Sequence, residues 1–407
     1  MPRLAAAVAP EHAVPALRRP GEPAIFFDGR GGHDGSWPCR LLLQPRLSTV
    51  QGLDALSVLI QGRRERGGPG GTGVAAAFRY EGGFTAWESD ASLTFESGGT
   101  TGAGDRALLD DAERRLDREP PGLTAPHASG APDTSLPRER YLAAVRRIQD
   151  HIRRGDIYQA NLTQTLSRSI EGDPWPLYET LASQWPAPRS AFVEARNGAL
   201  LSISPEVFVD VTSGGLAETR PIKGTRRRHE APDLDRRAAE DLLASAKDRA
   251  ELVMIVDLER NDLGRLARTG TVRVPELLAL KSYPTVHHLV ARVTAELEDR
   301  TAAALIRAVF PGGSIVGAPK ERAREILRSL EPVPRGLYTG SLFWFDDDGS
   351  TLSSILIRSI VVSRGLASVG AGGGILADSD PEAEWAEAND KARALTGALG
   401  FMPEEAS

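Results

Sequence analysis

Residues 354–380 read SILIRSIVVSRGLASVGAGGGILADSD. The apolar run Ser354–Ser363 predicts a β-strand, and Ala367–Val369 predicts a second strand soon after it. Three consecutive glycines, Gly372–Gly374, end that second strand, and a helix is expected over Glu382–Leu399. Two strands in succession followed by a helix do not match the repeating strand–helix order of a β/α barrel.

The same irregular order extends outward from this stretch. Further strands are expected at Ile157–Leu166, Ser190–Glu194, Leu200–Ile203, Val207–Val211 and Gly340–Phe345. Further helices are expected at Leu234–Leu258, Ala302–Val309 and Lys320–Ser329, and between Ser135 and Gly155. Because strands and helices do not alternate regularly, we predict an α+β fold of layered sheets and helices.

Composition divides the chain into three parts. Residues 1–95 read as a strand-rich N-terminal module of short apolar runs punctuated by glycines. Residues 96–135 are rich in proline and glycine and predict a linker or long loop, in which Asp105–Arg118 could form a short charged helix. Residues 136–402 contain most of the predicted strands and helices and form the main domain.

Composition and charge exclude several classes of protein. The 407 residues are 41% hydrophobic and 26% charged, and their formal net charge of −6 comes without a basic stripe for nucleic acid. No apolar run approaches the ~18 residues of a membrane span, and no signal peptide is evident, so a cytoplasmic protein is expected. The single cysteine, Cys39, excludes an internal disulfide and a multi-cysteine zinc site.

Two predicted helices carry acidic pairs three residues apart. Asp248 and Glu251 share one helix face, and Glu384 and Glu387 share another. If the two helices meet across a cleft, their carboxylates are hard oxygen ligands suited to Mg²⁺. The alternative is a pair of solvated faces, on which Lys391 forms an ordinary ion pair with Glu387.

Six ordered segments resemble the chorismate-utilising enzymes. They are Glu218–Thr225, Ile255–Arg265, Val286–Val290, Phe310–Lys320, Ile355–Arg358 and Ala371–Asp380. The family includes anthranilate synthase component I, aminodeoxychorismate synthase component I, and the isochorismate and salicylate synthases. The resemblance covers about residues 136–400, so it implies that 136–402 is a chorismate-binding catalytic domain. It also implies two antiparallel sheets flanked by helices, with the active site in a cleft between them.

The resemblance assigns roles to residues of this chain. Glu251 and Glu387 would bind Mg²⁺ directly, with Asp248 and Glu384 contacting it through water. Arg358 would grip a carboxylate of chorismate, a role suited to its planar fork of donors. The other residues expected to bind or line the substrate site are Gly372, Gly373, Gly374, Lys391, Tyr338, His288, Thr225 and Gln159.

Three positions distinguish branches of the family. Aminodeoxychorismate synthases usually carry lysine where this chain has Lys223, whereas anthranilate synthases usually carry alanine. A neutral lysine amine could attack C2 of chorismate as the C4 hydroxyl leaves, and ammonia could then replace it at C4. Glu206 resembles the general acid that protonates this hydroxyl. Gln159 stands where isochorismate and salicylate synthases carry a water-activating lysine, so ammonia chemistry is favoured.

The sequence also allows other interpretations. Lys223 could be a surface charge in a turn, and the activity could be that of anthranilate synthase or, less in keeping with Gln159, of isochorismate or salicylate synthase. A non-catalytic paralogue is a further alternative. Arg227 and Val316 depart from residues common in the family, which leaves rate and product fidelity open. Because Cys39 lies in no glycine-rich elbow, we expect ammonia from a separate glutamine amidotransferase subunit.

Overall fold

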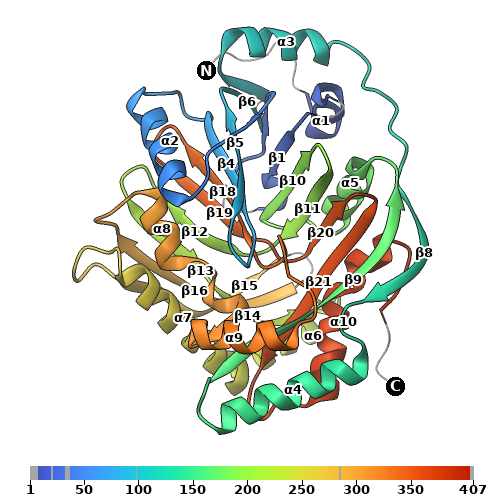
Figure 1. The fold of residues 1–407 in the computed structure, drawn as a ribbon, viewed down its shortest axis with the longest axis vertical. Helices are drawn as coiled ribbons and strands as arrows, with labels where there is room; N and C mark the ends of the chain where they lie inside the picture. The colour runs from blue at the N-terminus through green and yellow to red at the C-terminus, as the bar shows by residue number, and fades with distance from the viewer. Residues whose placement is uncertain (1–7, 20–21, 33–36, 98, 284–285, 404–407) are drawn as a thin grey trace.

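The computed structural model describes residues 8–403, except residues 20–21, 33–36, 98 and 284–285. In these residues the chain forms two large antiparallel sheets with helices packed around them (Figure 1). The predicted α+β fold of two antiparallel sheets flanked by helices is confirmed. No helix of the described residues is long and apolar enough to cross a membrane.

The first sheet, sheet I, has eleven strands within the described residues. In spatial order they are β17 (Gly317–Ala318), β9 (Gln159–Glu171), β21 (Leu366–Ile375), β20 (Ser359–Ser363), β11 (Gly198–Ser204), β10 (Arg189–Ala195), β1 (Ala24–Asp28), β2 (Arg40–Leu42), β6 (Ala91–Glu96) and β7 (Gly99–Gly104), with β8 (His127–Thr134) pairing β9.

Sheet II has ten strands in the described part of the chain. In spatial order they are β14 (Ile222–Arg227), β16 (Val286–Glu296), β13 (Leu216–Arg220), β12 (Val207–Val211), β19 (Thr351–Ile355), β18 (Ser341–Asp346), β4 (Gly73–Phe78), β5 (Phe84–Ser89) and β3 (Arg46–Leu47), with β15 (Arg273–Ser282) pairing β16.

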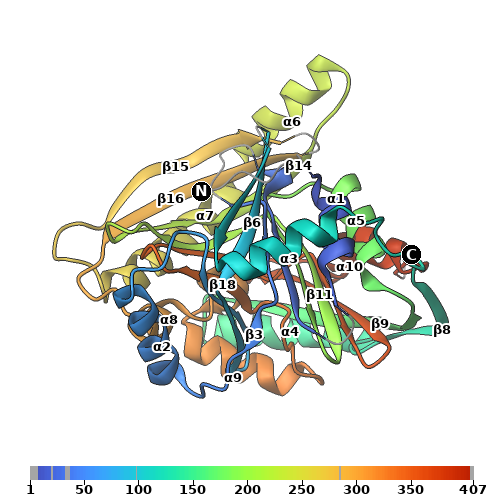
Figure 2. The same ribbon diagram turned by 90° about the horizontal axis from the view of Figure 1, so that it is seen from above.

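The helices pack around the two sheets (Figure 1). They are α1 (Pro10–Leu17), α2 (Leu53–Glu65), α3 (Arg106–Leu116), α4 (Arg138–Arg153), α5 (Pro174–Gln184), α6 (Pro232–Ala244), α7 (Ala246–Gly264), α8 (Ala302–Val309), α9 (Lys320–Leu330) and α10 (Pro381–Ala398). Helix α6 projects from the body beside β14 and β15, as Figure 2 shows.

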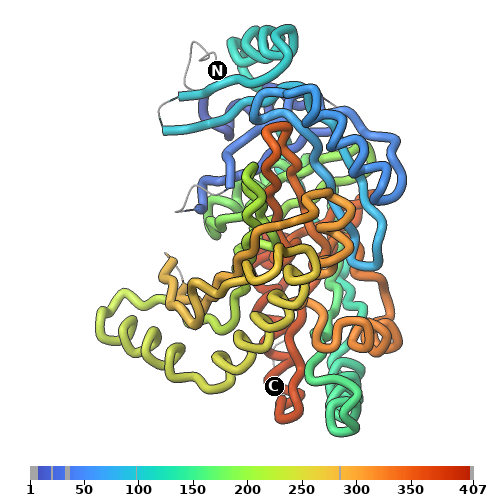
Figure 3. The backbone as a smooth tube through the Cα atoms, turned by 90° about the vertical axis from the view of Figure 1, so that its left-hand side faces the viewer, coloured from blue at the N-terminus to red at the C-terminus, as the bar shows by residue number. Residues whose placement is uncertain are grey.

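The N-terminal residues extend both sheets. Strands β1, β2, β6 and β7 join sheet I, and β3, β4 and β5 join sheet II. Residues 96–135, predicted as a linker or loop, contain β7, the expected charged helix α3, and β8. In Figure 3 the N-terminal segments, in blue, lie at the opposite end of the molecule from the C-terminal residues. The two sheets therefore hold segments from distant parts of the sequence together.

The core is built from strands that are buried on both faces. In β1 the side chains of Ile25 and Phe27 pack between the two sheets with Trp344 of β18, whereas Phe26 packs on the other face against Trp175 of α5. Successive side chains of a strand point to opposite faces, so an uninterrupted apolar run fits a sheet that is covered on both sides.

Two elements that were predicted to be continuous are each divided in the structure. The expected helix Leu234–Leu258 is two helices, because Ser245 is extended and its hydroxyl accepts the amide of Asp248 as the N-cap of α7. The expected strand Ser354–Ser363 is also divided. Its first part, β19, belongs to sheet II, and its second part, β20, belongs to sheet I.

Candidate active site

A cavity of about 660 Å³ lies where the two sheets approach α7 and α10. We call it the main cavity. Its wall includes residues of β14, β16 and β21, of both helices, and of two connections between the sheets. A cleft of this size, lined by both charged and apolar side chains, suits a small polar ligand.

The two connections place a carboxyl and a guanidinium in the main cavity. Glu206 lies between β11 of sheet I and β12 of sheet II, and Arg358 lies between β19 and β20. The connections are hydrogen-bonded to each other, because the Ser204 hydroxyl donates to the Ile355 carbonyl at 2.6 Å and the Ile355 amide donates to the Glu206 carbonyl at 3.2 Å. The fold thus brings together two residues that are 152 positions apart (358 − 206).

Burial changes the proton affinity of Glu206. Its side chain is 5% exposed, and desolvation raises the pKa of its carboxyl to about 7, although Ser314 and the charge of Lys223 act in the opposite direction. A carboxylic acid with this pKa keeps a substantial protonated fraction near neutral pH. Glu206 therefore has the property that a general acid needs.

Arg358 occupies an unusual backbone conformation for a residue with a side chain. Its φ is +51°, and its Nη1 donates to the Lys391 carbonyl at 2.9 Å. Burial lowers the pKa of the guanidinium, and no carboxylate among the described residues forms an ion pair with it. A buried guanidinium of this kind is poised for an anionic ligand.

The glycines of β21 leave one edge of that strand open to the main cavity. Strand β20 pairs with β21 only as far as Val369, so no described strand covers this edge from Gly370 onward. A Cβ on Gly370 would lie 2.1 Å from the Tyr338 ring, and one on Gly374 would lie 2.0 Å from Nε2 of Gln159. Only glycine fits here, and the backbone remains accessible to a ligand.

Lys223 reaches the main cavity from a bulge in β14. Gly224, at φ +72°, shifts the register, so that Lys223 pairs with Leu289 and Thr225 pairs with His288 on β16. A side chain at Gly224 would meet Asp248 of α7 at 2.8 Å. The Lys223 ammonium lies 3.8 Å from Oε2 of Glu251.

His288 and Thr225 form a neutral polar pair in the same wall. The Thr225 hydroxyl lies 3.0 Å from Nδ1 of His288. Burial lowers the pKa of His288 to about 4, and the positive charge of Arg358 contributes in the same direction. The imidazole is therefore neutral at pH 7 and can act as a hydrogen-bonding group beside a substrate.

The four acidic side chains predicted to bind a metal all line the main cavity, and each has a basic partner. Asp248 pairs with Arg226 at 3.4 Å, Glu251 with Lys223 at 3.8 Å, Glu384 with Lys247 at 3.8 Å, and Glu387 with Lys391 at 2.7 Å. Burial raises the pKa of Glu251 and of Glu384, whereas at Glu387 the ion pair with Lys391 outweighs burial and lowers the pKa.

These carboxylates fit a magnesium ion that also takes ligands from water and substrate. In the described residues no three acidic, histidine or cysteine side chains are gathered closely enough to enclose a metal by themselves. Mg²⁺ usually binds through one or two carboxylates and keeps several waters. Glu251 and Glu387, from two helices on one cavity, are a donor set of this kind.

The main cavity contains most of the site residues predicted from the sequence. Two of them, Gln159 and Gly373, are not part of its lining: Gln159 is buried behind Gly374, and the Gly373 Cα faces Glu384 and Lys391. The sequence analysis missed several polar lining residues, among them Asn161, Lys247 and Ser314. Ser314 lies within a segment that carried the family resemblance, and Asn161 lies two residues after Gln159, but Lys247 had no distinguishing signal.

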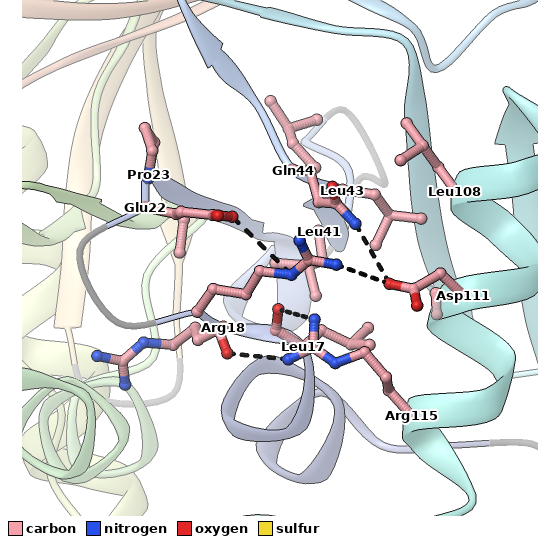
Figure 4. Close-up of a pocket in the computed structure, with 14 residues that line it drawn as sticks. Leu17, Arg18, Glu22, Pro23, Leu41, Leu43, Gln44, Leu108, Asp111 and Arg115 are labelled. Carbon is pink, nitrogen blue, oxygen red and sulfur yellow. Dashed lines mark hydrogen bonds and ion pairs between the residues drawn. The ribbon is translucent and has the colours of Figure 1, made fainter.

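A second hollow, the N-terminal hollow, is closed by polar contacts (Figure 4). It lies between α1, α3 and the segment after β2, and its volume is about 20 Å³, enough for about one water molecule. Asp111 accepts hydrogen bonds from Arg19 at 2.9 Å and from Gln44 at 3.2 Å, while Arg115 donates to the Leu17 carbonyl at 3.0 Å. These contacts fasten the two helices to sheet I.

The sequence of this chain is similar to those of known proteins that bind chorismate. Residues 60–397 match the family described as chorismate binding enzyme. The chain belongs to this family. Within the family, it is 46% identical over 272 residues to aminodeoxychorismate synthase component 1 of Salmonella typhimurium, covering 67% of this chain and 60% of that protein.

Another curated relative has the name of a different synthase. The chain is 43% identical over 291 residues to anthranilate synthase component 1 of Thermus thermophilus, covering 71% of this chain and 63% of the relative. The chain thus spans about three fifths of the length of these curated relatives. The solved anthranilate synthase component I of Streptococcus pneumoniae has the same fold, with a TM-score of 0.77 at 24% identity over 93% of this chain and 91% of that one.

Proposed function

We propose that this chain is the chorismate-converting component of an aminodeoxychorismate synthase, which forms 4-amino-4-deoxychorismate from chorismate and ammonia. The observation that carries the proposal is the position of Lys223, which lines one cavity with Glu206 and Arg358. The 46% identity to a synthase of this name supports it. The product would serve p-aminobenzoate and folate synthesis.

The residues of the main cavity support two successive substitutions. In the first, the Lys223 amine forms a bond to C2 of chorismate, both conjugated ring double bonds shift, and the C4–oxygen bond breaks as Glu206 donates a proton, so that water leaves. In the second, ammonia bonds to C4 and loses a proton, both double bonds shift back, and the bond between Lys223 and C2 breaks as the lysine nitrogen takes up a proton; the proton that the lysine nitrogen lost in the first step restores Glu206. The sum is chorismate plus ammonia giving aminodeoxychorismate plus water, with Lys223 regenerated.

The remaining residues would hold the substrate during these steps. Arg358 and the open edge of β21 would bind a carboxylate, and the neutral His288 would stand beside the ring. Magnesium, bound by Glu251 and Glu387 with Asp248 and Glu384 acting through water, would anchor the ring carboxylate of chorismate and offset its charge.

The ammonia would come from a separate glutamine amidotransferase subunit. Cys39, the one cysteine in the sequence, is partly buried, and desolvation raises the pKa of its thiol to about 12. A thiol that remains protonated at neutral pH is a poor nucleophile for glutamine hydrolysis. We therefore expect the chain to use ammonium salts alone, and glutamine only when a partner subunit is present.

The decisive experiment is a product assay with chorismate, Mg²⁺ and ammonium at mildly alkaline pH. Addition of aminodeoxychorismate lyase should convert the product to p-aminobenzoate. The Lys223→Ala variant should lose at least about a thousandfold in rate, the scale at which an essential nucleophile acts. Lys281→Ala is the matched control, because Lys281 lies on β15, is half exposed and pairs with Glu276 outside the main cavity.

Other products would overturn the proposal in distinct ways. Anthranilate would assign the activity of the Thermus thermophilus relative and remove the nucleophilic role of Lys223. Isochorismate formed without ammonium would point to water addition. An absence of chorismate consumption by the well-folded chain would indicate a non-catalytic member of the family.

A further inference from the structure

Lys247 is a basic side chain of the main cavity that the proposed reaction does not use. It lies at the second position of α7, directly before Asp248, and its ammonium faces Glu384 at 3.8 Å. Glu251, Glu387 and Asp378 also contribute negative charge at its position. The ammonium therefore stands among the carboxylates that would surround a metal ion.

The four basic partners of the acidic residues differ in how firmly they are held. Arg226 also donates to Asp241 at 2.6 Å and to the Thr225 carbonyl at 3.1 Å, and Lys391 also donates to the Gly372 carbonyl at 3.1 Å. Lys247 and Lys223 each have one ion pair among the described residues, at 3.8 Å.

Solvent exposure distinguishes Lys247 from the other three basic partners. The exposed fraction of the side chain is 52% for Lys247, compared with 38% for Lys391, 33% for Arg226 and 16% for Lys223. A half-exposed lysine on a flexible stem can move its ammonium into water at little cost. Glu384 would keep a hydrogen bond from the Ser379 hydroxyl, at 2.6 Å, after such a movement.

We propose that Lys247 is a resident counter-cation that competes with the divalent metal for the carboxylates of α7 and α10, and so sets the affinity for that metal. The inference rests on the proposed magnesium site. Before the metal binds, the Lys247 ammonium offsets the charge of Glu384. When the metal enters, the two positive charges repel each other, and the ammonium turns toward solvent.

The test is the dissociation constant for Mg²⁺, measured by titration calorimetry on the full chain at low ionic strength and pH 8. The measurement is made once with chorismate and once without it, and ammonium is left out of both so that no turnover occurs. Removing one positive charge in Lys247→Met should tighten Mg²⁺ binding about tenfold, a scale consistent with one partly screened charge near a divalent ion. Lys247→Arg keeps the charge and should stay within about twofold of the wild type. Raising the salt concentration should shrink the difference.

The possible outcomes distinguish competition by Lys247 from the proposed magnesium site on which it depends. Lys281→Met removes an equally exposed charge on β15 and should leave the constant unchanged. If the wild type binds Mg²⁺ but Lys247→Met binds it equally or more weakly, competition by Lys247 is overturned. If the wild type binds no Mg²⁺ under either condition, the magnesium site itself is overturned.

Discussion

The main cavity and the N-terminal hollow are both lined by opposite charges, but they use them differently. In the N-terminal hollow, hydrogen bonds of 2.9–3.2 Å around Asp111 and Arg115 leave room for only about 20 Å³. In the main cavity, three of the four carboxylates predicted to bind a metal lie 3.4–3.8 Å from their basic partners, around a volume of about 660 Å³.

This difference indicates that the charges of the N-terminal hollow stabilise the fold, whereas those of the main cavity are available to a ligand. Charges that satisfy one another at short range fix the positions of helices, whereas charges that meet loosely across a cavity can exchange partners with a ligand. Variants in the main cavity should therefore alter activity more than stability, and variants in the N-terminal hollow should do the reverse.

The largest effect on activity among the following variants is expected from Glu206→Gln. Loss of a general acid lowers kcat by about 10²–10⁴-fold. In the wild type, the rate at a fixed concentration of free ammonia should fall as pH rises through about 7, because the protonated form of Glu206 is then lost. The variant should lack this dependence, which steady-state assays across pH would show.

Glu206→Gln should lower the activity but raise the stability of the folded protein above neutral pH. The pKa of Glu206 is raised from 4.5 to about 7 by folding, so its favourable contribution is complete below pH 4.5 and is lost as pH rises to about 7. At pH 8, Glu206→Gln should therefore be more stable than the wild type by at most about 3 kcal/mol. Urea unfolding at pH 5 and pH 8 would measure the change.

A control for Glu206 lies outside the main cavity. Glu259 of α7 is hydrogen-bonded to Thr219 at 2.5 Å, and burial raises its pKa to about 8. Glu259→Gln should alter the pH dependence of stability in the same direction while retaining activity. An equal loss of activity in both variants would mean that a buried carboxyl, rather than proton donation by Glu206, is what the enzyme requires.

An intermediate effect is expected from Arg358→Lys. A lysine keeps the charge but loses the two-pronged geometry for a carboxylate, so KM for chorismate should rise about 10- to 100-fold with a smaller change in kcat. Arg364→Lys is the matched control, since Arg364 also has positive φ (+50°) but is exposed in the turn between β20 and β21. An unchanged KM in Arg358→Lys would remove Arg358 from carboxylate binding.

Arg358 also shows how far the sequence predicted the fold. The apolar run 354–363 predicted β-structure, but nothing in the run indicated that the chain changes sheets at Leu356–Arg358, where Arg358 takes a left-handed conformation. Both β19 and β20 are largely buried, so the side-chain pattern does not distinguish one long strand from two. The crossing depends on contacts with β11 and β12, which are distant in sequence.

The candidate site was predicted better than its detailed environment. The expected residues were assigned from the family resemblance, and nearly all of them line one cavity, because the order and chemistry of the six segments are specific to the family. The partner of each carboxylate was not predictable, except for Lys391 four residues after Glu387 on one helix. Lys247 in particular reads as an ordinary surface lysine until α7 and α10 are placed side by side.

The smallest effect is expected in the N-terminal hollow. Asp111→Ala removes the acceptor of Arg19 and Gln44, and because these groups are about one-third exposed, the free energy of unfolding should fall by only about 1 kcal/mol. Activity should stay within about twofold, since the hollow is separate from the main cavity. Asp110→Ala, on the same helix, removes an exposed pair with Arg106 and should cost less. A large loss of activity in Asp111→Ala without loss of stability would show that the N-terminal hollow communicates with the main cavity, and the contrast between fixed and exchangeable charges would then fail.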